Sequence, residues 1–244
     1  MSTGMLIYII VMGWTLIVYG SIAYFIIKKK EYGLISGFSN RPKEEQEYLI
    51  QNGFIEKLGK VLLYSFFMLV IAAVLPIFHI PYGVEIGWGL FIIFTFGGLL
   101  YLQKFEFPTK RKKYRWLYGI IAILTIGLII GVSFAGNQDN EILIENNTFI
   151  ISGMYGIEWS LERIENVELL KKLPEVVMKT NGFSSGNSRK GKFKLEEPYG
   201  FGRLFVTGDK GPFLYIRVND DYVILNRPTE QETIEFYERI MDEL

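Results

Sequence analysis

The chain has no cysteine and only one histidine, His79, among its 244 residues. Without cysteine it cannot form disulfides or thiolate metal sites. His79 has no clustered carboxylates near it in the sequence, so we expect an interfacial residue at the end of a membrane span and no metal. Neither a nucleophilic serine elbow nor a histidine-paired nucleophile is found in the sequence. These absences predict a non-enzymatic protein without a cofactor.

Charged residues are also missing from the middle of four apolar runs, at about 5–27, 58–80, 86–103 and 116–136. Each run is close to the roughly 20 residues that a helix needs to cross a bilayer. We therefore expect residues 1–136 to form a four-span transmembrane domain, with Pro76 bending the second helix. Ion pathways usually need charged groups inside the membrane, so their absence argues against an ion-coupled transporter. No basic residue precedes the first run, which favours a retained span over a cleaved signal.

The formal net charge is zero, but the two signs are distributed unevenly along the chain. Residues 1–136 hold 13 Lys and Arg and 7 Asp and Glu, whereas residues 137–244 hold 13 and 19. The halves thus carry net charges of +6 and −6. A change of sign at a boundary in composition predicts two modules, and residues 137–244 are enough to bury one small core.

All basic residues of the first half lie in two alternate loops between the expected spans. They are Lys28, Lys29, Lys30, Arg41, Lys43, Lys57 and Lys60 in the first loop, and Lys104, Lys110, Arg111, Lys112, Lys113 and Arg115 in the second. Short loops rich in Lys and Arg stay in the cytoplasm. We therefore expect both loops inside the cell, and the N-terminus and the C-terminal domain outside it.

The first basic loop contains a short motif that runs from Gly33 through Gly37-Phe38-Ser39-Asn40-Arg41-Pro42 to Tyr48. This motif resembles that of small bacterial membrane proteins of domain-of-unknown-function family 3784, over about residues 5–80. The family tends to have Asn-Thr where this chain has Ser39-Asn40, and Asp where it has Leu49. The resemblance implies a bacterial membrane protein and its topology, and no chemistry.

The same loop should hold a short helix that lies along the membrane. Gly37 is expected to supply a turn, and Pro42 to occupy the first helical position, followed by acidic residues in the first turn. Glu44, Glu45 and Glu47 would then form a solvated acidic face, or alternatively a surface on which a partner docks.

After residue 141 the pattern changes to short segments rich in β-branched and aromatic residues, which predict strands. We place them at 142–145, 148–152, 157–159, 167–170, 176–180, 203–207, 213–218 and 222–225. The last segment is different, because Thr229 and Glu232 form a capping box and Ile234, Tyr237 and Ile240 recur at helical spacing. We expect antiparallel strands that form a barrel closed by a C-terminal helix.

This order is that of a pleckstrin-homology barrel, and residues 142–244 resemble the bacterial pleckstrin-homology-like domain of membrane proteins. The matching segments are Gly156 to Ile164, Gly200 to Arg203, and Tyr222 to Leu225. The expected fold class is therefore membrane α + β. The resemblance does not imply phosphoinositide binding, because the bacterial domains are not reliable lipid binders.

Residues 182–194 are rich in Gly and Ser and predict a flexible hairpin loop. Four cations, Arg189, Lys190, Lys192 and Lys194, make it basic within an acidic domain, so it is the candidate contact for an anionic ligand or lipid headgroup. The segment that starts at Gly186 follows the phosphate-binding P-loop pattern for seven positions, but Phe193 stands where Ser or Thr must bind magnesium. We do not expect nucleotide binding.

Together these patterns predict a multi-pass protein of a bacterial plasma membrane that presents a pleckstrin-homology-like module to a protein or peptide. Envelope stress or immunity against a membrane-active peptide is the setting that analogy suggests. The alternative is a small-molecule or lipid transporter, or an accessory subunit of one. Membrane lipids and a protein or peptide are the expected partners, nucleic acid is not one, and the oligomeric state stays open.

Overall fold

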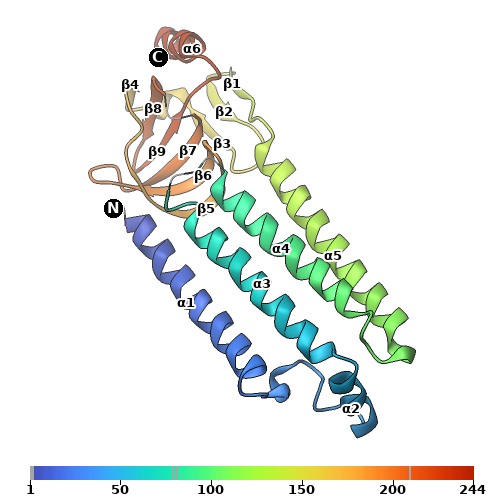
Figure 1. The fold of residues 1–244 in the computed structure, drawn as a ribbon. Helices are drawn as coiled ribbons and strands as arrows, with labels where there is room; N and C mark the ends of the chain where they lie inside the picture. The colour runs from blue at the N-terminus through green and yellow to red at the C-terminus, as the bar shows by residue number, and fades with distance from the viewer. Residues whose placement is uncertain (1–2, 79, 81, 209) are drawn as a thin grey trace. The chain divides into compact units, whose positions relative to one another are not determined.

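The computed structural model describes residues 3–78, 80, 82–208 and 210–244, which form two compact units (Figure 1). One unit is Met5–Ile129, and the other joins the described residues up to Gly4 to Ile130–Leu244. The division falls inside the last long helix, whereas the change in composition places it near residue 136. Each unit has a core of its own and is described by itself.

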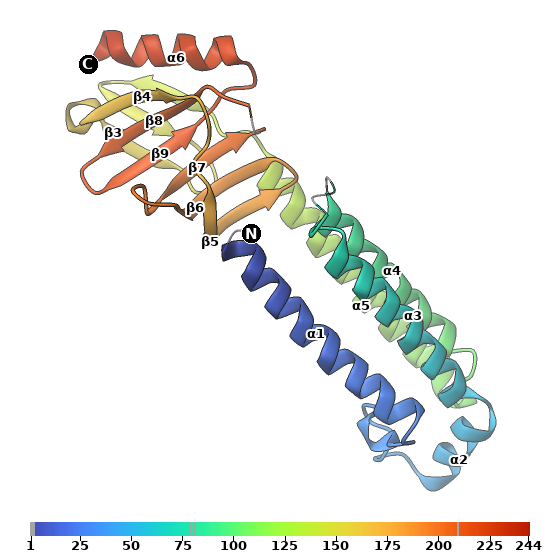
Figure 2. The same cartoon turned by 60° about the vertical axis from the view of Figure 1, so that its left-hand side comes forward.

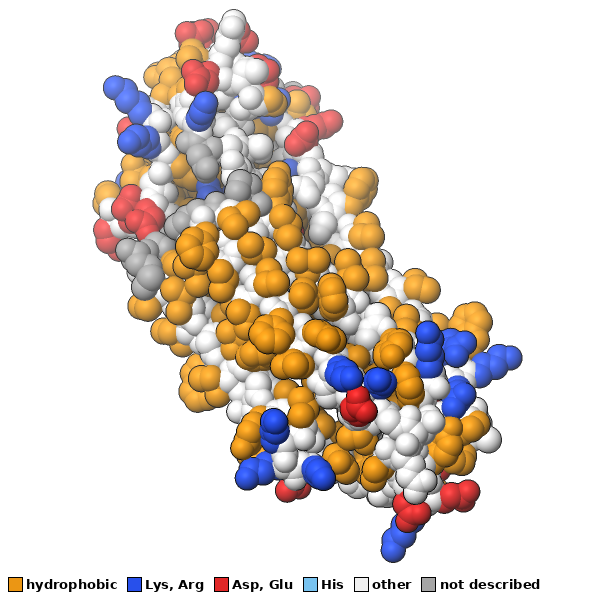
Figure 3. Space-filling view, in the orientation of Figure 1, with side chains coloured by type: hydrophobic (Ala, Val, Ile, Leu, Met, Phe, Trp, Pro, Cys, Tyr) orange, Lys and Arg blue, Asp and Glu red, His pale blue; other side chains and the backbone are white. Residues whose placement is uncertain are grey.

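Four described helices are long and apolar enough to cross a membrane, as the sequence predicts. They are α1 (Thr3–Ile27), α3 (Phe54–Val74), α4 (Gly83–Leu102) and α5 (Pro108–Asn137). Hydrophobic side chains cover the face of these helices that Figure 3 shows, as a lipid-facing surface requires. A short helix, α2 (Lys43–Gln51), and a 3₁₀ turn (Tyr32–Leu34) lie between α1 and α3.

The second span differs from its predicted bounds of 58–80. Helix α3 begins at Phe54 and ends at Val74, so Pro76 follows the helix and does not bend it. This is the expected effect of a proline that lacks a backbone N–H and restricts the residue before it. His79 and Pro81 lie outside the described residues. Helix α5 begins at Pro108, earlier than predicted, and so includes the cations from Lys110 to Arg115.

Helices α1, α3 and α4 pack through small residues and through hydrogen bonds between the helices. Met12, Leu69 and Ala73 form the centre of this contact. The Tyr8 hydroxyl donates to the backbone oxygen of Ala72 at 2.8 Å. A Cβ atom at Gly87 would lie 2.4 Å from the Cα of Ala72, so only glycine permits this approach of α4 to α3. The two helices run side by side in Figures 1 and 2.

The C-terminal unit contains a three-stranded antiparallel sheet of β1 (Ile142–Glu145), β2 (Thr148–Ile151) and β3 (Ile157–Ser160). Asn146 and Asn147 form the turn between the first two strands, with φ values of 49° and 62°. Both values are positive, as a two-residue hairpin turn requires, and asparagine tolerates them.

A second sheet has six strands in the order β4-β8-β9-β7-β6-β5. They are β4 (Asn166–Leu170), β5 (Val176–Ser185), β6 (Ser188–Leu195), β7 (Phe201–Thr207), β8 (Phe213–Val218) and β9 (Asp221–Leu225). The all-antiparallel prediction is wrong for one pair, because β9 turns back at Asn219 and lies between β8 and β7, parallel to β7. The described strand pairings leave β4 and β5 at the edges, so they show two sheets and no closed barrel.

One core of the C-terminal unit lies on the face of the six-stranded sheet that is covered by the smaller sheet and helix α6 (Glu230–Glu243). A second apolar cluster, which includes Phe193 and Leu204, lies on the opposite face. Ile240 of α6 is fully buried, and the ring of Phe236 lies 6.4 Å from that of Phe149 on β2. The Thr229 hydroxyl accepts from the backbone N–H of Glu232 at 3.1 Å, which confirms the predicted cap. Figure 2 shows α6 along the sheets, with the strands beneath it.

Candidate functional site

The four candidate cations lie on strand β6, and the loop that the sequence predicts for 182–194 is instead a hairpin of β5 and β6. Only Gly186 and Asn187 separate the two strands. Because side chains alternate along a strand, Arg189 faces one side of the sheet and Lys190, Lys192 and Lys194 face the other. The structure therefore does not bring all four cations together.

Lys190 is not presented to solvent. Its exposed fraction is 7%, and its ammonium group donates to the backbone oxygen of Gln138 and lies 4.0 Å from the carboxylate of Asp139. Burial lowers the pKa of Lys190, and the charge of Asp139 only partly offsets this effect. Lys190 thus holds the chain segment that follows α5.

Lys192 lies in an open groove of about 520 Å³ at the other end of the same face. The residues that line the groove come from β3, β5, β6, β7, the 3₁₀ helix Leu161–Arg163 and the β8–β9 hairpin. They are Trp159, Arg163, Thr180, Lys192, Phe193, Phe201, Gly202, Arg203, Val218, Asn219, Asp220 and Asp221. Arg203 forms an ion pair with Asp221. No ion pair is found for Lys192 or Arg163 within the described part of the chain, so both are available to an acidic ligand.

Two aromatic side chains give the groove an apolar component. Phe201 is 61% exposed, and the ammonium group of Lys194 lies 5.3 Å from its ring centre. Trp159 is half-buried on β3, with its ring 6.3 Å from that of Phe149. Strand β3 is also an edge of its sheet, so among the described residues no strand pairs with its outer side. An unpaired edge beside an aromatic surface can accept an extended peptide.

A second polar cluster links the two basic loops of the helical unit. Arg41 donates two hydrogen bonds to the carboxylate of Glu106, at 2.6 and 3.0 Å, and the Glu106 side chain is only 3% exposed. Burial by itself would lower the pKa of Arg41, but Glu106, with smaller effects of Tyr114 and Glu45, raises it above its usual value. The guanidinium is therefore charged, and a bidentate pair of this kind fixes the two loops relative to each other.

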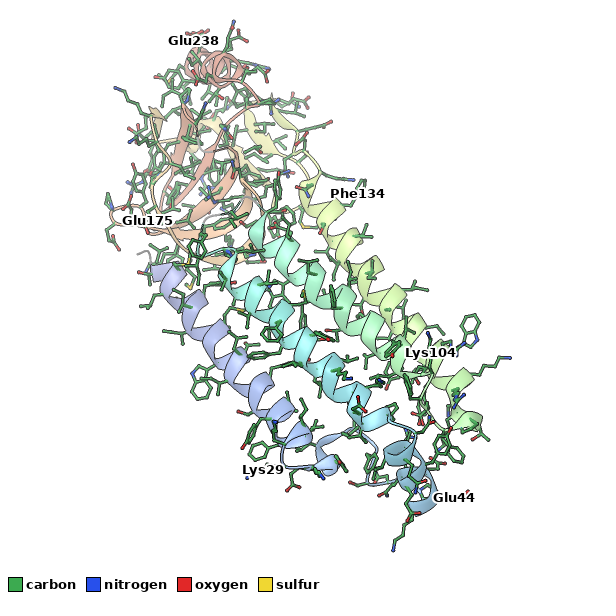
Figure 4. All side chains as sticks on the ribbon, in the orientation of Figure 1. Lys29, Glu44, Lys104, Phe134, Glu175 and Glu238 are labelled. Atoms are coloured by element: carbon green, nitrogen blue, oxygen red, sulfur yellow. The ribbon has the colours of Figure 1, made fainter. Side chains whose placement is uncertain are left out.

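Glu45 belongs to this cluster, so the prediction of a solvated acidic face is wrong for this residue. Its carboxylate lies 2.7 Å from the ammonium of Lys110 and 3.6 Å from Arg41, and its side chain is mostly buried. Glu44 and Glu47 are exposed, as predicted. The prediction that Gly37 supplies a turn is confirmed by its φ of 74°. Figure 4 labels Lys29, Glu44 and Lys104 at one common end of the helices.

Residues 10–106 match the family model of a domain of unknown function, DUF3784. The resemblance expected from the first loop is confirmed over these residues. They cover α1 from its second turn, α2, α3 and α4, and they end at Glu106, the partner of Arg41. No curated protein and no solved structure matches the chain. The pleckstrin-homology-like resemblance of residues 142–244 stays a prediction.

The DUF3784 region contributes an ion-pair network that joins Arg41 to Glu45 and Glu106. Within the described residues, no group of three or more His, Cys, Asp or Glu side chains could hold a metal ion. The hydroxyls of Thr95 and Ser65, one on α4 and the other on α3, lie 3.3 Å apart and bond to each other. Each hydroxyl thereby has a hydrogen-bond partner within the contact between α3 and α4.

Proposed function

We propose that the chain is a non-enzymatic integral membrane protein whose C-terminal β domain recognises an extended, acidic peptide segment of a protein partner. The groove that contains Lys192 and Arg163 supports this proposal. The peptide would pair with the outer edge of β3 through its backbone and place an apolar side chain between Trp159 and Phe201. Its acidic side chains would meet the two free cations. Backbone pairing gives affinity in this mode, and side-chain pockets give specificity.

The relation to the pleckstrin-homology-like domain is part of the same proposal. It is supported by the order of short strands followed by a capped C-terminal helix. The parallel pair of β7 and β9 departs from that order of antiparallel strands. Recognition of a peptide therefore rests on the groove and does not require the family relation. A role in envelope stress or peptide immunity would follow if the partner is itself a membrane-active peptide.

Site-specific photo-crosslinking in cells can test the groove. A photoreactive residue at Phe201 should give one discrete adduct, and the same residue at exposed Lys172, outside the groove, should not. The double change Lys192→Glu and Arg163→Glu should weaken the interaction at least about tenfold, because it replaces attraction by repulsion of an acidic partner. The matched control is Lys171→Glu with Lys172→Glu. Equal adducts from Phe201 and Lys172, no adduct at all, or equal losses in the two double variants would contradict the proposal.

The proposed side of the membrane is testable with reporters. We propose that the β domain lies outside the cytoplasm of a bacterial cell, because both basic loops lie at the same end of the helices and the domain follows the fourth span. A periplasm-active reporter fused after Leu244 should be active, and the same reporter after Lys112 should be inactive. The reverse pattern would place the domain in the cytoplasm.

A further inference from the structure

A second groove, of about 500 Å³, lies on the DUF3784 region between α3 and α4. Its lining consists of Lys57, Lys60, Val61, Tyr64, Ile93, Phe94, Gly97, Gly98 and Tyr101. Two adjacent glycines shape it. A Cβ atom at Gly98 would lie 2.4 Å from the side chain of Val61, so this glycine lets the helices touch. A Cβ atom at Gly97 would meet nothing within 4 Å, so this glycine leaves the groove open.

The two ends of this groove differ in chemistry. Val61, Ile93 and Phe94 line one part of it with apolar side chains, whereas Lys57 and Lys60 occupy the end nearer the basic loops. Both lysines share one carboxylate, that of Glu56, at 3.8 and 2.8 Å. The ammonium of Lys104 adds a third cation, 5.4 Å from the ring centre of Tyr101 at the same end. Cations therefore outnumber carboxylates at this end of the groove. Figure 3 shows the blue Lys and Arg side chains gathered at that end of the helices.

We propose that this groove binds an anionic phospholipid. The phosphate would lie between Lys57 and Lys60, and one acyl chain would run along Val61 and Phe94 over Gly97. The volume falls within the range of about 300–1,000 Å³ that is usual for small-molecule sites. Basic pockets between membrane helices bind acidic headgroups because the charges attract where water is scarce. A zwitterionic lipid also carries an ammonium group, which the excess of cations repels. The lipid belongs to the leaflet at the basic end of the spans.

Native mass spectrometry of the full-length chain, released from mixed detergent and lipid, can measure this selectivity. Phosphatidylglycerol should be retained at least about tenfold more than phosphatidylcholine. The double change Lys57→Ser and Lys60→Ser should remove this preference. The control, Lys28→Ser with Lys29→Ser, deletes two exposed cations at the same end of the helices but outside the groove, and should keep it. Equal retention of the two lipids by the native chain, or equal loss in both double variants, would overturn the proposal.

A second pair of variants tests the acyl part of the site. Gly97→Phe should fill the groove and reduce retention of phosphatidylglycerol at least about fivefold, because it occupies the space of an acyl chain. Gly89→Phe is the matched control, since a Cβ atom there also meets nothing within 4 Å but the residue does not line the groove. Soluble glycerol phosphate, which has no acyl chain, should not compete. Competition by glycerol phosphate, or equal losses for both phenylalanine variants, would exclude a lipid occupant.

Discussion

A chain truncated after Pro228 should lose the ordered core of its β domain while its helical unit still folds. The truncation removes α6, and with it Ile240, which is fully buried among residues of both sheets. Removing one large buried side chain typically costs about 2–5 kcal/mol, and the truncation also removes Phe236 and Tyr237, which are partly buried against the same core. The total free energy of unfolding of a small domain is typically about 5–15 kcal/mol. Hydrogen exchange of the full chain in detergent should therefore show loss of protection in β8 and β9.

Two point variants test whether the loss comes from the buried face of α6. Ile240→Ala should destabilise the domain by about 3 kcal/mol, and Ile234→Ala, at a 39% exposed position of the same helix, by less than about 1 kcal/mol. Unchanged protection of β8 and β9 after truncation would show that α6 does not belong to the core.

Glu106→Gln should lower the stability of the helical unit by about 3 kcal/mol, because it removes the bidentate partner of Arg41 in a largely buried site and leaves only the more distant carboxylate of Glu45. Thermal unfolding in detergent, followed by the helical signal in circular dichroism, measures the loss. Glu44→Gln is the control. It removes an exposed carboxylate of the same loop and should change stability by less than about 0.5 kcal/mol.

A double-mutant cycle with Arg41→Met separates the pair from its surroundings. The double variant should lose less stability than the sum of the losses in the two single variants. Each single change leaves one charge without its partner, whereas the double change removes both charges. Additive effects, or a loss for Glu106→Gln no greater than that for Glu44→Gln, would show that the ion pair does not hold the two loops together.

Most elements could be predicted from periodicity, and the main failure was strand β6. Eight strands alternate clearly enough, and four spans are long and uncharged. In β6, Gly and Lys occupy so many positions that only Phe193 and Leu195 show an apolar alternation, too few to distinguish a strand from a basic loop. The groove could not be predicted for the same reason, because Lys192 lies beside Arg203 only as a result of the register between β6 and β7.

The pair of Arg41 and Glu106 was missed although the sequence carried a signal for it. Glu106 is the only acidic residue between the third and fourth spans, and it stands between Phe105 and Phe107 among many cations. A lone carboxylate flanked by aromatic residues is a candidate for burial, and burial requires a partner of opposite charge. Its partner lies 65 positions earlier in the chain, and no local pattern could identify it.

The short connection between α5 and β1 limits how far the β domain can move from the end of α5. Helix α5 ends at Asn137 and β1 begins at Ile142, so four residues join them and can span at most about 14 Å. The hydrogen bond from Lys190 to Gln138 shortens even this reach, and Phe183 lies so close to Gly136 that a Cβ atom there would overlap its ring. The domain therefore cannot move far from the end of α5. A partner of the proposed kind would have to reach the domain near the end of α5, and a force on that partner would pass into α5 through this short connection.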